Sequence, residues 1–116
     1  MIRSLRVARP YTPYVPETIG EMMDYLAMMM LKSPTFKDDY FTERNVETVF
    51  SALNQGLGNL QKKLGGERYQ TLRVMSERMR AHFEADPEGK TDDALAGRRI
   101  IQEMEDILRS TYKKKK

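Results

Sequence analysis

The sequence contains no cysteine and no tryptophan, only one histidine, and no long hydrophobic run. Without cysteine the chain cannot form disulfides, thiolate zinc sites, iron–sulfur clusters or a thiolate nucleophile. The longest apolar run, Leu26–Leu31, has six residues, whereas a membrane-spanning helix requires about 20. The start of the chain also lacks the apolar core of a secretory signal. We therefore expect a cytoplasmic protein without a membrane segment.

The 116 residues that are present suit one globular domain, with 40% hydrophobic and 32% charged residues. The net charge of +3 is unevenly distributed. Residues 1–16 carry +3 and the tail Lys113–Lys116 carries +4, so residues 17–112 carry −4. A basic stripe along a helix, which marks nucleic-acid binders, is therefore missing from the body of the chain. We do not expect nucleic acid to be the main partner.

We predict that the first 16 residues form an extended basic arm. Prolines recur every third residue from Pro10 to Pro16, and Tyr11 and Tyr14 have the same spacing. In polyproline II, with three residues per turn, each set forms one edge. The arm is either a strap laid over the rest of the chain or a docking peptide for a partner, and we favour the strap.

Apolar residues at helical spacing predict four helices. They cover approximately residues 17–32, 42–64, 67–85 and 91–112. The three connections are short, which favours antiparallel neighbours. We therefore expect an all-α fold in which residues 17–112 form an up-down four-helix bundle with an extended N-terminal arm.

The second of these helices has the clearest apolar stripe. We expect Thr42 to cap its start, with Phe41 packing on Val46 as a hydrophobic staple. The stripe stays in phase through Gly56 and Gly58, so we interpret the segment as one helix. Glycines at these positions would let a neighbouring helix approach closely.

Few residues suggest catalysis. His82 lies on the apolar face of the third helix, where we expect it to be partly buried and hydrogen-bonded. Neither a second histidine nor a cysteine is available to complete a common metal site. The Gly56–Gly58 pair lies inside a helical stripe and not between a strand and a helix, so it is no phosphate loop. We therefore expect no enzyme activity, no cofactor and no metal.

The first connection and the helix after it combine aromatic and acidic residues, a mixture that is typical of interface anchors. We predict a partner-binding site made of Asp38, Asp39, Tyr40, Glu43 and Glu47. The carboxylates would form a negative patch around an amphipathic tyrosine. The alternative is that the loop aromatics only pack locally, with Phe36 filling the end of the bundle.

The first helix is rich in methionine, which fills cores but also adapts to partner surfaces. The apolar positions extend beyond the predicted core face. We predict a second possible interface at Tyr25, Met28 and Met29. The alternative is that the N-terminal arm covers these residues.

Two segments resemble the small helical immunity proteins that protect bacteria from type VI secretion toxins, in particular NAD(P)-degrading ones. One is Ser33–Phe36 (SPTF), which follows an apolar helix and precedes a long second helix. The other is Met79–Glu88 (MRAHFEADPE), which precedes the last helix. The resemblance covers about residues 17–108. It implies stoichiometric binding to a toxin domain without catalysis.

These observations predict a non-catalytic protein-binding module, such as an immunity protein that blocks a toxin. The negative body of the chain would favour a basic protein partner. One alternative is a self-associating structural or regulatory protein that forms a homodimer through the methionine-rich helix. Another is a nucleic-acid accessory protein that acts through its basic termini.

Overall fold

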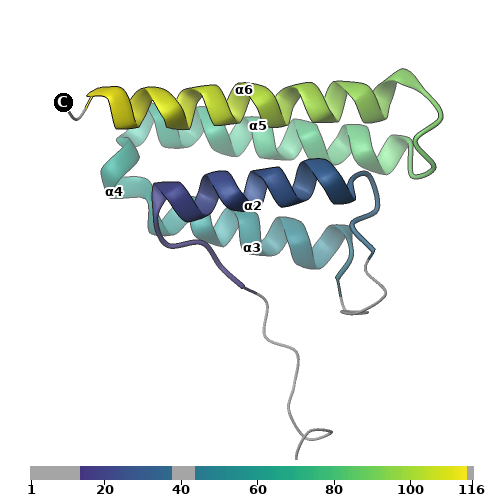
Figure 1. Ribbon diagram of the computed structural model, residues 1–116, viewed down its shortest axis with the longest axis horizontal. Coiled ribbons are helices and arrows are strands. Elements are labelled where there is room, and N and C mark those ends of the chain that lie inside the picture. The colour runs from purple at the N-terminus through teal and green to yellow at the C-terminus, as the bar shows by residue number, and fades with distance from the viewer. Residues whose placement is uncertain (1–13, 38–43, 115–116) are drawn as a thin grey trace, which may run out of the picture.

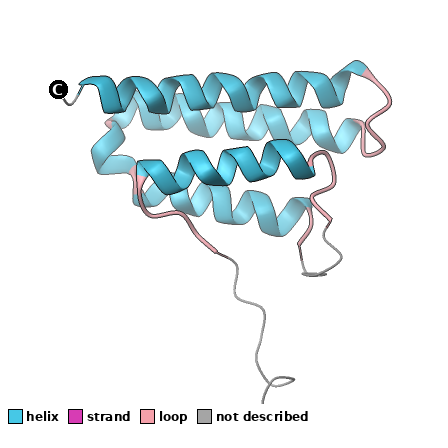
Figure 2. Ribbon diagram, in the orientation of Figure 1, coloured by secondary structure: helices cyan, strands magenta, loops and turns pink. Residues whose placement is uncertain are grey.

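The computed structural model describes residues 14–37 and 44–114, and within these ranges all regular secondary structure is helical, with loops and turns between the helices (Figure 2). The described helices are α2 (Ile19–Lys32), α3 (Val46–Asn59), α4 (Gln61–Leu64), α5 (Gly66–Ala85) and α6 (Asp92–Lys114). The expectation of an all-α fold is therefore confirmed for the described part of the chain. Most of the arm and the end of the lysine tail lie outside the described residues.

The four long helices alternate in direction along the chain (Figure 1). Helix α2 contacts α3 and α6, and α5 contacts the same two helices from the other side. The short helix α4 links the end of α3 to the start of α5 (Figure 1). This arrangement leaves one face of α2 pointing away from the other helices.

The core lies between the long helices and is built from the predicted apolar stripes. On α5 and α6 the stripes are buried as expected, at Leu72, Met75, Met79, Phe83, Ile101, Met104 and Leu108. Phe36 fills one end of the core with its ring edge-on to Phe50 at 5.7 Å and to Phe83 at 5.5 Å between centroids. For Phe36, the alternative of local packing at the end of the helices is therefore confirmed.

Helix α2 begins two residues later than predicted. Thr18 caps it, because its hydroxyl accepts a hydrogen bond from the Glu21 backbone N–H at 3.0 Å. A carboxylate oxygen of Glu21 accepts in turn from the backbone N–H of Glu17 at 2.8 Å. Pro16, just before the cap, is buried beside Gly56 of α3, where an added Cβ would lie 3.1 Å from its ring. At Gly56 the added Cβ would also lie 2.9 Å from Met22 of α2, so the expected close approach of a helix is confirmed there. At Gly58 the expectation is wrong, because no atom lies within 4 Å of an added Cβ.

Helix α3 differs from the prediction at both ends. Its N-cap is Asn45 and not Thr42, because Asn45 and Thr48 cap each other's backbone N–H groups at 3.0 Å. The predicted single helix is also divided at Leu60, whose ψ of 6° leaves the helical range. Leu60 and Leu64 stay buried across this bend, so the apolar stripe continues although the helix does not. The chain then turns into α5 through Gly65, which has a φ of 86°.

Candidate functional site

A cavity of about 260 Å³ lies between α2 and the residues that precede α3. Its lining consists of Tyr14, Asp24, Tyr25, Met28 and Arg44. These residues come from three segments of the chain, namely the end of the arm, helix α2 and the N-terminal approach to α3. The cavity thus combines two aromatic rings, a thioether, one carboxylate and one guanidinium.

Tyr25 forms the fixed part of this cavity. Its side chain is 7% exposed, and its hydroxyl donates a hydrogen bond to the backbone carbonyl of Val49 in α3 at 3.2 Å. The ring of Tyr14 lies against it in a tilted pair, with 6.2 Å between centroids. Tyr14 itself is 52% exposed, so about half of this residue remains accessible to a partner. The pair therefore presents an aromatic surface that is anchored to α3.

Acidic side chains surround Tyr14. Desolvation raises the pKa of the Tyr14 phenol, and both the charge of Glu21 and a hydrogen bond to its carboxylate raise it further. The carboxylates of Asp24 and Glu17 act in the same direction. Because negative charge accumulates around the phenol, this edge of α2 attracts cations. Arg44 supplies the one positive group in the lining.

The structure brings together only some of the residues that the sequence singled out. Asp38, Asp39, Tyr40 and Glu43 lie outside the described residues, so their role stays a prediction. Glu47 is exposed in the first turn of α3.

The expected second interface needs a correction, because Tyr25 and Met29 are buried in the chain's own core. Tyr25 is held by its bond to α3, and Met29 is fully buried. Met28 is half-buried, and together with Tyr25 it lines the cavity.

Sequence reasoning missed Tyr14, Asp24 and Arg44 as members of a site. One signal was available, because Glu17, Glu21 and Asp24 are spaced four and three residues apart. That spacing places Glu21 and Asp24 on one side of the helix, with Glu17 just before its cap. The contribution of Arg44 could not be inferred, since it depends on how the chain returns from α2 to α3.

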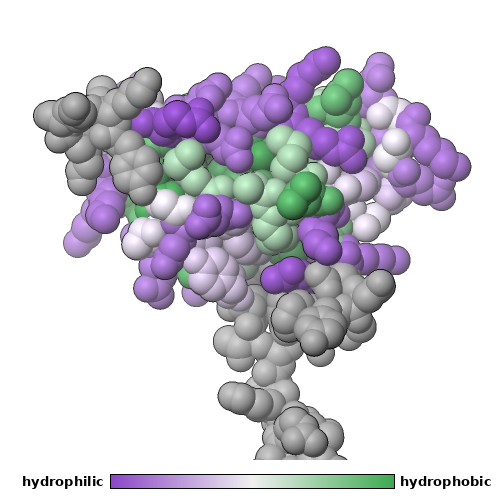
Figure 3. All heavy atoms as spheres, in the orientation of Figure 1, coloured by the Kyte–Doolittle hydropathy of each residue, from purple (hydrophilic) through white to green (hydrophobic). Residues whose placement is uncertain are grey.

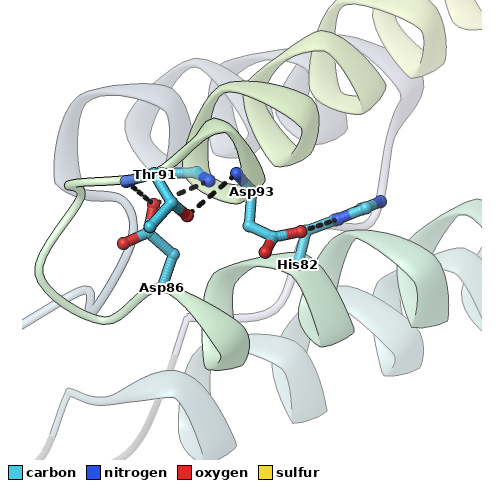
Figure 4. Close-up of polar contacts among 5 residues, drawn as sticks. His82, Asp86, Thr91 and Asp93 are labelled. Carbon is cyan, nitrogen blue, oxygen red and sulfur yellow. Dashed lines mark hydrogen bonds and ion pairs between the residues drawn. The ribbon is translucent and has the colours of Figure 1, made fainter.

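A second polar cluster joins the end of α5 to the start of α6 (Figure 4). Asp86 is 3% exposed, and its carboxylate accepts hydrogen bonds from the backbone N–H groups of Lys90, Thr91 and Ala94 at 2.8 to 3.1 Å. Burial alone would raise the pKa of Asp86, but the bonds from Thr91, Lys90 and Ala94 outweigh it and lower the pKa to about 2. The carboxylate therefore caps the turn.

His82 belongs to the same cluster. Its Nδ1 lies 2.8 Å from a carboxylate oxygen of Asp93, so the pair connects the last turn of α5 with the first turn of α6 (Figure 4). The expectation of a partly buried, hydrogen-bonded histidine is confirmed. No cavity that we describe includes His82, and within residues 14–37 and 44–114 no three potential ligands gather at a metal site. The contacts of His82 are those of a residue that holds two helices together.

A second hollow of about 480 Å³ lies at the corner between α4 and α5. It is lined by Leu64, Gly65, Gly66, Glu67, Arg68, Thr71, Ile107 and Ser110. The guanidinium of Arg68 donates to the backbone carbonyl of Leu64 at 3.2 Å. The hollow is wide, and it lacks the aromatic surface found beside α2.

Comparison with known proteins finds no matching family model, no matching curated protein and no matching solved structure. In the described part of the chain, none of the helices has the length and apolarity needed to cross a membrane. The resemblance to immunity proteins therefore stays a prediction, and the functional argument depends on the geometry beside α2.

Proposed function

We propose that the chain is a non-catalytic protein-binding module, built as an up-down four-helix bundle, that binds a basic protein surface beside α2. The observation that carries this proposal is the convergence of acidic side chains on an accessible, anchored tyrosine pair. Hot spots in protein interfaces are commonly aromatic residues surrounded by a polar rim. Tyr14 supplies the aromatic face, and Glu17, Glu21 and Asp24 supply the rim.

The cavity favours a lysine or arginine side chain as the group that enters it. A cation over the face of Tyr14 gains a cation–π contact, and the carboxylate of Asp24 adds an ion pair at the rim. Met28 provides a polarizable surface for the aliphatic part of such a side chain. Because Tyr25 is bonded to α3, little ordering accompanies binding.

The resemblance noted in the sequence suggests which kind of partner this is. Immunity proteins bind a toxin domain in the cytoplasm and block its active site without any turnover of their own. A toxin encoded next to this chain would therefore be the first partner to test. The acidic patch predicted at Asp38, Asp39, Tyr40 and Glu43 lies outside the described residues and stays a separate prediction.

Site-specific photo-crosslinking in cells tests the proposal. The photoreactive residue p-benzoylphenylalanine replaces Tyr14 in one variant and Val74 of α5 in a matched control, since the two positions are 52% and 53% exposed. We expect a protein adduct from position 14, none from position 74, and loss of the adduct when Asp24→Lys is added. Equal adducts from both positions, or an adduct that survives Asp24→Lys unchanged, would contradict the proposal.

A further inference from the structure

Basic residues from two separate segments belong to one end of the molecule. Residues 61–68, which span α4 and the start of α5, carry a net charge of +2, and residues 109–116 carry +5. The whole chain carries only +3, so all other residues together carry −4. Helix α4 and the end of α6 lie at the same end of the molecule (Figure 1). We call these two segments the basic end.

The hollow of about 480 Å³ described above lies between the two basic segments. Its lining comes from the end of α4 and the start of α5 on one side, and from α6 on the other. Lys62 and Lys63 are exposed on α4, directly before Leu64 of the lining. The Arg68 guanidinium donates one N–H to the Leu64 carbonyl and has further N–H groups to donate. The lining contains one carboxylate, that of Glu67, so positive charge dominates around the hollow.

The carboxylates at the opposite end of the molecule are already paired within the chain. The carboxylate of Asp86 accepts three backbone hydrogen bonds. Glu84, Glu88 and Asp93 each lie 2.8 to 3.0 Å from the side chain of an arginine, a lysine or a histidine. Docking against a second copy would have to break or share these contacts. The acidic end of another copy is therefore a poor match for the basic end.

The basic end offers few apolar side chains to a lipid surface. A helix that lies in a membrane interface presents large apolar residues beside its basic ones. The space-filling view shows hydrophobic side chains along α2 and toward α6, with hydrophilic ones around them (Figure 3). Of the described residues, the exposed large hydrophobic ones all lie outside α4 and the second half of α6, at Tyr14, Leu31, Val74 and Leu95. The surface is also hollowed, which suits a ridge of phosphates better than a flat bilayer.

We propose that the basic end binds the phosphate backbone of a nucleic-acid duplex without reading its sequence, through Lys62, Lys63, Arg68 and the lysines from Lys113 onwards. Such contacts position a protein on a duplex but carry no base specificity. Within the described residues the lining of the hollow includes no aromatic side chain, so unpaired bases have no ring on which to stack. A duplex carries one negative charge for about every 1.7 Å of its axis, a density that suits clustered lysines.

Binding of this kind is weak and depends on salt. The logarithm of the association constant falls with the logarithm of the salt concentration, with a slope of about −0.9 for each phosphate contact. We expect a dissociation constant on the order of 1–100 µM at physiological ionic strength. Lys62 and Lys63 do not line the cavity beside Tyr14, so this surface and the proposed protein-binding site can fail separately.

Fluorescence anisotropy of a labelled, mixed-sequence DNA duplex of about 20 base pairs, between about 50 and 200 mM salt, tests the proposal with the full chain. Lys62→Gln combined with Lys63→Gln should weaken binding about tenfold or more at the lowest salt and make the salt slope shallower by about 2. The matched control, Lys37→Gln with Lys90→Gln, removes the same charge from exposed positions at the opposite end and should change the affinity little. Unchanged binding by the α4 variant, or equal weakening by both variants, would overturn the proposal.

Cysteine protection locates the contact, and it has no background because the chain has no natural cysteine. Ser110→Cys places a thiol in the lining of the hollow, and Ser51→Cys places one at an exposed position of α3. The duplex should slow the reaction of iodoacetamide several-fold at position 110 and leave the rate at position 51 unchanged. Equal protection at both positions, or protection at position 51 alone, would show that the duplex does not bind at the basic end.

Two other polyanions serve as competitors for the same surface. Vesicles that contain phosphatidylserine present anionic lipid, and poly-glutamate presents an acidic protein chain. Both should bind the unaltered chain more weakly than the duplex does. Stronger binding to the vesicles or to poly-glutamate, with loss on Lys62→Gln and Lys63→Gln, would replace the nucleic acid as the occupant and overturn the proposal.

Discussion

Replacing glycine by alanine should change the stability of this chain in opposite directions at two positions, one in the tight contact between α5 and α6 and one in open space on α3. Gly97 of α6 faces Phe83 of α5, and an added Cβ there would lie only 2.5 to 2.8 Å from three atoms of the ring. The ring cannot move aside easily, because Phe83 is fully buried and its other contacts include Phe36 at 5.5 Å. Gly58 of α3, in contrast, has no atom within 4 Å of an added Cβ.

The expected free energies follow from two competing effects. Alanine favours a helix by about 1 kcal/mol over glycine. Overpacking a core costs about 1–3 kcal/mol, and contacts as short as those at Gly97 belong to the upper end of that range. Gly97→Ala should therefore lower the free energy of unfolding by about 2 kcal/mol. Gly58→Ala should raise it by up to about 1 kcal/mol.

Urea denaturation followed by far-UV circular dichroism measures both variants against the unaltered chain. The urea concentration at the midpoint of unfolding should fall for Gly97→Ala and rise for Gly58→Ala. The dependence of the unfolding free energy on urea concentration should stay unchanged in both variants. A further variant that combines Gly97→Ala with Phe83→Leu should recover part of the loss, because the smaller side chain frees the space. Should Gly97→Ala match or exceed the stability of the unaltered chain, the close packing of α6 on Phe83 would be wrong.

Two further predictions concern the core and the turn between α5 and α6. Leu53→Ala should lower the free energy of unfolding by about 2–5 kcal/mol, because Leu53 is fully buried, and an unchanged urea midpoint would disprove its place in the core. The pKa of Asp86 is about 2 in the folded chain and about 3.9 in an unfolded one, so its contribution to stability is complete above about pH 4 and declines as the pH falls towards 2. Asp86→Asn should flatten this part of the stability profile, and a profile as steep as that of the unaltered chain would contradict the assignment.

The sequence predicted the helices from their apolar spacing but did not predict where they begin and bend. The stripes of α5 and α6 are buried as expected, because burial of one face dominates the energy of a helix in a folded chain. The start of α3 was misplaced because Thr42 and Asn45 both suit an N-cap, and only the structure shows the mutual capping of Asn45 and Thr48. The bend at Leu60 could not be predicted from the apolar spacing, because the leucines on either side of it remain buried.

The candidate site was predictable only in part, because its residues come from segments that lie apart in the sequence. Tyr25 and Met28 were singled out as residues of a contact surface, and both line the cavity. Their partners come from segments on either side of α2, and the hydrogen bond from Tyr25 to Val49 spans 24 residues. Spacing along one helix carries no information about such contacts. Tyr14 and Arg44 could therefore be assigned to the site only from the folded structure.

The buried carboxylate of Asp86 also has a consequence for the order in which the chain folds. Helices α5 and α6 are consecutive, and the loop that joins them is short. Their association therefore closes only a small loop, which favours early formation. Asp86 fixes the turn through three backbone bonds that need no other part of the molecule. We therefore expect this hairpin to form early, so that weakening its turn slows folding more than it hastens unfolding.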